Sequence, residues 1–129
     1  MSAPTVVGLS IPADESEPVA VVALEPSLAG IRQYVGEHGT EPYLEAIALG
    51  ARADGGALAH MWVDEDGRAL AHAPNRRASV LAAGRVLGGG AIVGDVLVLG
   101  STPEGDEASL TVDALAMLTR ALGVEVMAK

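Results

Sequence analysis

Two stretches of the chain are apolar on both faces of an extended strand, and they set the strongest limit on its fold. They are P-V-A-V-V-A-L at 18–24 and A-I-V-G-D-V-L-V-L-G at 91–100. Strands that are rich in Val and apolar at nearly every position are typical of the buried interior of a sheet. A third segment, P-Y-L-E-A-I-A-L-G at 42–50, alternates as a strand does. The chain is therefore expected to fold around a β-sheet.

Three segments carry the signals of helices. A first helix is expected after the N-cap residue Ser27, where apolar residues recur at helical spacing. A second is expected over about 76–83 after the N-cap residue Asn75. A third is expected over about 112–122 after the N-cap residue Thr111. The predicted fold class is α+β, a mostly antiparallel sheet with two or three helices packed on one face.

Residues 57–73, A-L-A-H-M-W-V-D-E-D-G-R-A-L-A-H-A, are interpreted as a β-hairpin with a three-residue loop at 65–67. This register places His60 opposite His72, with Trp62 on the same face, whereas a two-residue turn shifts the pairing by one position. The other face carries small or apolar side chains on which a helix can pack: Ala59, Met61, Val63, Ala69 and Ala71.

At 129 residues the chain is expected to form a single α+β domain over 18–129. Residues 1–17 are interpreted as an N-terminal extension or edge strand, in which the run 5–9 pairs at a sheet edge, is exchanged between subunits, or forms a loose tail. Residues 101–108 are expected to be a solvated loop. The Gly-rich stretch 84–90 is interpreted as a flexible turn, because it lacks the Lys-Ser/Thr of a Walker loop and does not lead from a strand into a helix.

Charge and composition exclude several classes of function. The net charge is −9, which disfavours nonspecific binding to nucleic acid or to an anionic membrane. The chain has no cysteine, so disulfides, thiolate nucleophiles and Cys-based zinc sites are excluded. It also lacks an apolar run of membrane-spanning length and the basic start of a signal peptide. A cytoplasmic location is expected, in the host cell if the protein is encoded by a phage.

Positive charge is concentrated around the start of the second helix. Arg76 and Arg77 lie in its first turn beside Asn75, and Arg85 follows the helix. Each guanidinium presents donors suited to a phosphate or carboxylate, and a helix start disfavours cations unless an anion compensates. These residues are therefore candidates for binding an anionic ligand. The alternative is that Arg76 or Arg77 forms an ion pair within the protein, with Asp64, Glu65 or Asp95 as the partner.

The predicted hairpin face supplies candidates for contact with a ring. Trp62 is the sole Trp, and together with His60, His72 and Tyr34 it could contact a nucleobase or an oligomer interface. The two histidines could coordinate a metal, but no third ligand is fixed by spacing, so no metal site and no cofactor are expected. No nucleophile elbow, zinc-protease motif or Cys–His pair is present. The chain is therefore expected to bind a ligand and not to be an enzyme.

The order of several short motifs resembles the domain of unknown function 3846 family, small proteins of phages, plasmids and actinobacterial mobile elements. In that family an acidic turn is followed by an N-R-x-A helix start and an I-x-G-D-x-x-x-x-G strand. The resemblance covers about residues 20–122 and departs from the family in the Gly-rich stretch and the N-terminus. It implies a mobile-element context and no established reaction. The matching motifs are V-G (35–36), A-I-A-L (46–49), W-V-D-E-D-G (62–67), P-N-R-R-A (74–78) and I-V-G-D-V-L-V-L-G (92–100).

These observations together favour a phage-type, non-catalytic binding protein that sequesters a small anionic or nucleotide ligand, with a counter-defence role. The alternatives are an acidic protein-interaction module, a DNA mimic that inhibits a host protein, and a structural oligomer. The predicted third helix carries a single acidic residue, Asp113, which disfavours the DNA mimic. A homo-oligomer is expected, because strands that are apolar on both faces leave more surface than helices on one face can cover.

Overall fold

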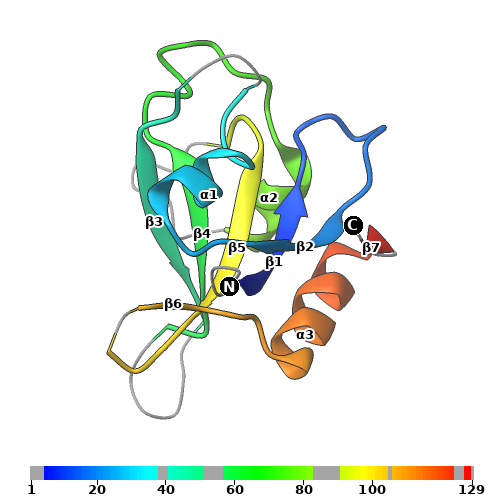
Figure 1. Cartoon of the computed structure of the whole chain (residues 1–129). Helices are drawn as coiled ribbons and strands as arrows, with labels where there is room; N and C mark the ends of the chain where they lie inside the picture. Colours follow the sequence, from blue (N-terminus) through cyan, green and yellow to red (C-terminus); the bar gives the residue numbers. More distant parts are fainter. Residues whose placement is uncertain are drawn as a thin grey trace.

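The computed structural model describes residues 5–37, 41–50, 57–82, 91–104, 106–123 and 127–128 (Figure 1). The elements, in chain order, are β1 (Val6–Ile11), β2 (Ala20–Leu24), α1 (Leu28–Arg32), β3 (Leu44–Leu49), β4 (Ala59–Asp64), α2 (Arg76–Leu81), β5 (Val96–Ser101), β6 (Glu107–Ala108), α3 (Val112–Leu122) and β7 (Met127–Ala128).

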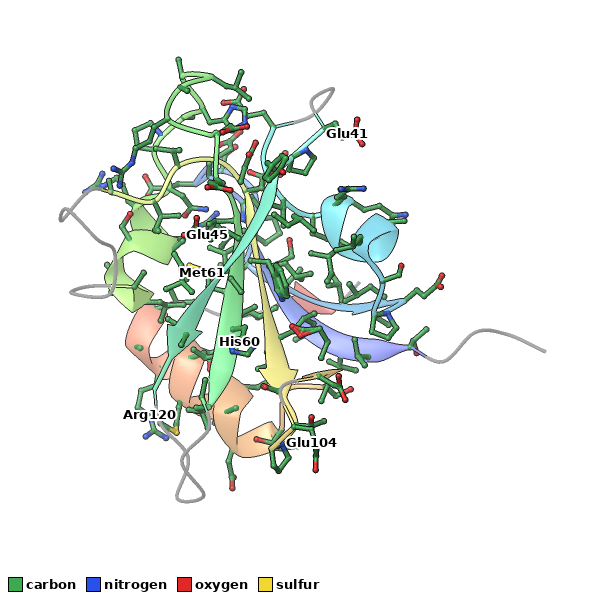
Figure 2. The ribbon with its side chains drawn as sticks, turned by 90° about the vertical axis from the view of Figure 1, so that its left-hand side faces the viewer. Glu41, Glu45, His60, Met61, Glu104 and Arg120 are labelled. Carbon is green, nitrogen blue, oxygen red and sulfur yellow. The ribbon has the colours of Figure 1, made fainter. Side chains whose placement is uncertain are left out.

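Within the described residues the strands form one sheet in the order β3-β4-β5-β1-β2-β7, and β6 pairs with β5. The β2–β7 pair is parallel and the other pairs are antiparallel. Figure 2 shows α2 and α3 on one side of the sheet and α1 on the other. The predicted α+β class, the mostly antiparallel sheet and the packing of two helices on one face are confirmed. The helix α1 covers the second face.

The first core lies between the sheet and the helices α2 and α3. Leu9 and Ile11 of β1 are fully buried in it, and Ala78 and Leu118 come from α2 and α3. The predicted alternation in β4 is confirmed, because one face of that strand supplies buried core residues at every second position: Ala59, Met61 and Val63.

The second core lies under α1 on the opposite face. Leu97 and Leu99 of β5 are buried there beneath Ile31 of α1. Their neighbours Val96 and Val98 belong to the first core, so β5 is buried on both faces as the sequence predicted. The apolar surplus that suggested a homo-oligomer therefore has an explanation within one chain.

The predicted hairpin at 57–73 is wrong. The strand β4 pairs with β3 and β5, so both of its edges are occupied, and consecutive turns follow it over 65–71. The carboxylate of Asp64 accepts a hydrogen bond from the backbone N–H of Asp66, and the backbone carbonyl of Asp64 accepts one from Gly67. Such local bonds compete with extended pairing. His60 and His72 are consequently not opposite each other.

Two other expectations are corrected by the sheet order. The strand β1 pairs with both β2 and β5, so residues 6–11 lie inside the sheet and form neither an edge strand nor a loose tail. The segment 101–108, expected to be a solvated loop, contains β6. The Gly-rich stretch at 84–90 lies outside the described residues. In the described part of the chain, no helix has both the length and the apolar character needed to cross a membrane.

Candidate functional site

An open cleft of about 530 Å³ lies between α1 and the second face of the sheet. His60 and Trp62 project into it because they alternate along β4 with the residues of the first core. Figure 2 labels His60 on β4. The lining residues come from the start of α1, from β3 and β4, and from the segment that leads into β6: Pro26, Ser27, Leu28, Ile31, Ala46, His60, Trp62, Asp106 and Glu107.

Glu107 is the polar centre of this cleft. Its Oε1 accepts a hydrogen bond from the indole Nε1 of Trp62 at 3.1 Å and lies 3.8 Å from Nδ1 of His60. The Glu107 side chain is 16% exposed and that of His60 is 22% exposed. Within the described residues, Oε2 of Glu107 and Nδ1 of His60 are buried without a hydrogen-bond partner. A buried polar atom that lacks a partner costs free energy, so these two atoms favour a ligand that can pair with them.

Burial raises the pKa of Glu107 above its ordinary value, since the ionised carboxylate is poorly solvated. The nearby His60 and the hydrogen bond from Trp62 act in the opposite direction, and the neighbouring charge of Asp106 acts in the same direction as burial. A positive charge or an N–H donor placed beside Glu107 would favour its ionised form.

Two close backbone approaches fix the walls of the cleft. A Cβ at Gly30 would lie 2.1 Å from the carbonyl oxygen of Glu25, so glycine allows the chain to enter α1 tightly. The hydroxyl of Ser27 caps this helix by accepting from the N–H of Gly30 at 3.1 Å, which confirms the predicted cap. A Cβ at Gly100 would lie 2.4 Å from the carbonyl oxygen of Ser109. Glycine at 100 therefore lets the segment after β6 pack against β5, and this packing positions Glu107.

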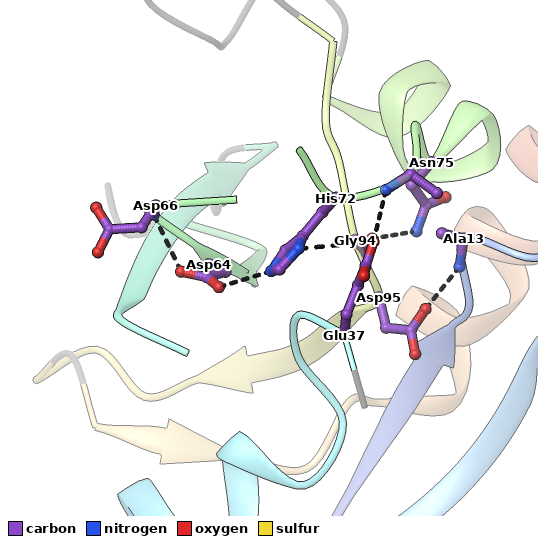
Figure 3. A network of polar contacts seen from close by, with 9 residues as sticks. Ala13, Glu37, Asp64, Asp66, His72, Asn75, Gly94 and Asp95 are labelled. Carbon is purple, nitrogen blue, oxygen red and sulfur yellow. Dashed lines mark hydrogen bonds and ion pairs between the residues drawn. The ribbon is translucent and has the colours of Figure 1, made fainter. Parts of the chain in front are cut away.

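A second polar cluster surrounds His72, as Figure 3 shows. Asp64 Oδ2 lies 3.0 Å from Nε2 of His72, and Asp64 Oδ1 accepts from the backbone N–H groups of Tyr43 and Asp66. Oε1 of Glu37 lies 3.6 Å from Nδ1 of His72 and accepts from the N–H of Ala73 at 2.8 Å. The His72 side chain is 1% exposed and lies in this buried cluster, away from Trp62, and its contact with a ligand stays a prediction. In the described residues no group of three or more His, Cys, Asp or Glu side chains could hold a metal ion.

Asn75 joins three parts of the chain from a fully buried position. Its Nδ2 donates to the carbonyl oxygen of Gly94 (Figure 3) and to that of Ile11, and its Oδ1 accepts from the N–H of Ala78 at 3.0 Å. The predicted N-cap of α2 is therefore confirmed. The Asn75 side chain is 0% exposed and its bonds lie within the protein, so the structure gives it a structural role, and its contact with a ligand stays a prediction.

The arginines of α2 bind the segment that follows β1. The Nη2 atom of Arg77 donates to the carbonyl oxygens of Pro12 at 2.6 Å and Asp14 at 3.1 Å. Arg76 is 81% exposed and lies 3.8 Å from the carboxylate of Glu15. An interaction within the protein was one of the two alternatives, but its partners differ from the acids that the sequence suggested.

The predicted ligand residues therefore separate into two groups. His60 and Trp62 meet in the cleft on the second face, whereas Arg76 and Arg77 belong to α2 on the first face. Tyr34 packs against the second core and is not among the residues that line the cleft. Arg85 lies outside the described residues.

Asp106 and Glu107 are the site residues that sequence analysis missed. They lie in a stretch of small, polar and acidic residues, and β6 itself has two residues, too few to show a period. The pairing of β6 with Gly100 and Ser101 brings them to the cleft.

Residues 9–123 match the model of the family described as a domain of unknown function (DUF3846), and the chain belongs to this family. Its segments 62–67, 74–78 and 92–100, which carried the resemblance, meet around His72 and Asn75. Among curated proteins no match was found.

Among solved structures, the chain is similar to the one titled "Crystal structure of small RNA methyltransferase HEN1", with a TM-score of 0.58 and 16% sequence identity. The similarity covers 91% of this chain and 16% of that chain. This likeness concerns the fold alone.

Proposed function

We propose that this protein binds a small planar ligand, such as a nucleobase or nucleoside, in the cleft between α1 and β4, and sequesters it without chemical change. One observation carries the proposal. The sole Trp of the chain lines an open cleft beside a largely buried carboxylate, and one oxygen of that carboxylate has no hydrogen-bond partner among the described residues.

The dimensions and lining of the cleft support a ligand of this size. Small-molecule sites usually have volumes of roughly 300–1,000 Å³ and combine an apolar lining with a few polar groups. Here Leu28 and Ile31 supply apolar surface, Trp62 supplies an aromatic ring, and His60 and Glu107 supply the polar groups. Apolar and aromatic side chains can pack against the two faces of a flat heterocycle, and polar side chains can form hydrogen bonds with the atoms along its edge.

Arg76 and Arg77 lie on the opposite face of the sheet from Trp62, so the ligand proposed here differs from the anionic or nucleotide ligand that the sequence suggested. Arg77 is engaged by two backbone carbonyls, and α2 lies across the sheet from Trp62. A phosphate held at α2 and a ring held at Trp62 would require two different faces of the sheet. The proposed ligand is therefore recognised through its ring and not through a phosphate.

A non-catalytic role is favoured by the state of the lining groups. Among the described lining residues the hydroxyl group belongs to Ser27, which accepts a hydrogen bond from the start of α1 and serves as its cap. Mobile-element origin and a counter-defence role stay predictions from the family resemblance. The homo-oligomer and the cytoplasmic location also stay predictions. Light scattering over a range of protein concentrations would test whether the protein forms a homo-oligomer.

The fluorescence of Trp62 provides a direct test, since no other Trp contributes. Titration of the full chain with adenosine, guanosine, cytidine and uridine should show saturable quenching by at least one of them. Leu28→Glu should weaken that binding several-fold. The control is Leu70→Glu, because Leu70 is similarly exposed (53% against 57%) but does not line the cleft. Absence of saturable quenching by all four, or equal effects of the two variants, would overturn the proposal.

A further inference from the structure

We propose that the cleft selects a planar group that carries positive charge and N–H donors, such as an amidine, a guanidine or a protonated amino-heterocycle. This inference rests on the proposed function and names the chemical class of its ligand. It joins three features of the same cleft: the sign of the lining charge, the unpaired oxygen of Glu107, and the position of the Trp62 ring.

The lining charge is negative. Asp106 and Glu107 both line the cleft, and in the described part of the chain no Arg or Lys does. Arg32 of α1 lies 3.9 Å from Glu41 and is not a lining residue. Among the described lining residues, His60 is the group that can carry positive charge, and it lies 3.8 Å from Glu107. An anionic ligand would therefore meet two carboxylates against one histidine, whereas a cationic ligand would be attracted by both carboxylates.

The geometry around Glu107 favours a donor. Trp62 already donates to Oε1 at 3.1 Å, while Oε2 is buried and lacks a hydrogen-bond partner among the described residues. A ligand N–H that donated to the carboxylate of Glu107 would offset this deficit, and a charged donor would form the stronger bond. Burial raises the pKa of Glu107, and a cation bound beside the carboxylate would favour its ionised form.

Trp62 adds a second preference for the same ligand. A cation near an aromatic ring is attracted to the negative face of its π-system, most strongly for Trp. The bond between Nε1 of Trp62 and Glu107 orients the ring next to the carboxylate. A flat cation can therefore contact the ring of Trp62 and donate to Glu107 in one bound position.

Three probes of nearly equal shape but different charge show how the charge of a ligand affects its affinity for the cleft. Benzamidine is cationic, benzamide is neutral and benzoate is anionic, and each can be titrated into the full chain at pH 7 while the fluorescence of Trp62 is followed. Benzamidine should bind roughly tenfold or more tightly than benzamide, the factor expected when a hydrogen bond gains full charge. Benzoate should bind more weakly than both.

Glu107→Gln tests the group that carries the inference. The substitution keeps an oxygen that can accept from Trp62 but removes the charge, so the preference for benzamidine over benzamide should fall roughly tenfold. Glu104→Gln is the matched control, because Glu104 is exposed and does not line the cleft (Figure 2). It should leave the preference unchanged.

The outcomes distinguish the two levels of the proposal. If benzamide or benzoate bound as tightly as benzamidine, or if Glu107→Gln left the preference unchanged, the inference that the ligand is a cation would be overturned. The proposal that the cleft binds a planar ligand would still stand. Absence of binding by all four nucleosides would overturn the proposed function, whatever benzamidine does. Absence of binding by benzamidine as well would overturn this inference too.

Discussion

Two carboxylates of this protein each lie beside a histidine, and their surroundings differ. Asp64 has a side chain that is 0% exposed, and its two oxygens are paired with His72 and with the backbone N–H groups of Tyr43 and Asp66. Glu107 is partly exposed, its Oε1 accepts from Trp62, and its Oε2 lacks a hydrogen-bond partner among the described residues.

The difference separates a structural network from the proposed binding site. A buried carboxylate with a partner on each oxygen holds chain segments together, and any change to it leaves several groups unpaired. Glu107 lines a cleft, and one of its oxygens is buried without a hydrogen-bond partner among the described residues, so its charge is poorly compensated. The histidines at 60 and 72 are the same residue type, so the number of partners on the neighbouring carboxylate distinguishes the two sites.

The largest effect should come from Asn75→Ala, in the structural network. The substitution leaves two buried carbonyls and one N–H without partners, and each such group costs about 1–3 kcal/mol, so the free energy of unfolding should fall by about 3 kcal/mol or more. Thr111→Ala is the control, since Thr111 caps α3 from an exposed position and its loss should cost about 1 kcal/mol. Equal losses in urea denaturation would show that Asn75 acts as a helix cap alone.

Asp64→Ala should come next, with a loss of about 2–3 kcal/mol, because it removes the acceptor for His72 and for two backbone N–H groups. Asp66→Ala should change stability by less than about 0.5 kcal/mol, because the Asp66 side chain is exposed. Thermal unfolding of both variants checks this difference. Similar melting temperatures of the two variants would contradict the structural role of Asp64.

A smaller difference is expected between the two arginines of α2. Arg77→Ala removes both hydrogen bonds that tie α2 to the segment after β1, and it should cost about 1–2 kcal/mol. Arg76→Ala removes an exposed ion pair with Glu15, which is worth about 0–1 kcal/mol. Chemical denaturation in low salt would measure both. A larger loss for Arg76 than for Arg77 would contradict the structural role of Arg77.

The smallest effect, and one of opposite sign, is expected at Glu107. Because its pKa is raised in the folded state, the ionised carboxylate destabilises the fold at a pH above that pKa, and the penalty disappears below the ordinary Glu value of about 4.3. Glu107→Gln should therefore raise the melting temperature slightly at pH 7, and the gain should shrink as the pH falls toward 4. Glu104→Gln is the control, because Glu104 is exposed and outside the cleft lining, and it should change the melting temperature little at pH 7. A lower melting temperature of Glu107→Gln at pH 7 would show that Glu107, like Asp64, stabilises the fold.

The comparison also shows how far the site could be predicted from the sequence. The alternation in β4 correctly placed His60 and Trp62 on one face and Met61 on the other. The predicted pairing of His60 with His72 was wrong, because it assumed that β4 continues into a hairpin. Glu107 could not be found, since its role depends on a two-residue strand that pairs with β5.

The sequence by itself determined the local features of this protein. The caps Ser27, Asn75 and Thr111, and the apolar segments that became β2 and β5, follow from side-chain chemistry within a few residues. Tertiary structure decided which strands pair, that β1 lies inside the sheet, and that α1 covers its second face. Those choices depend on contacts between residues far apart in the chain, and the polar groups of the two sites come from segments that only these contacts bring together.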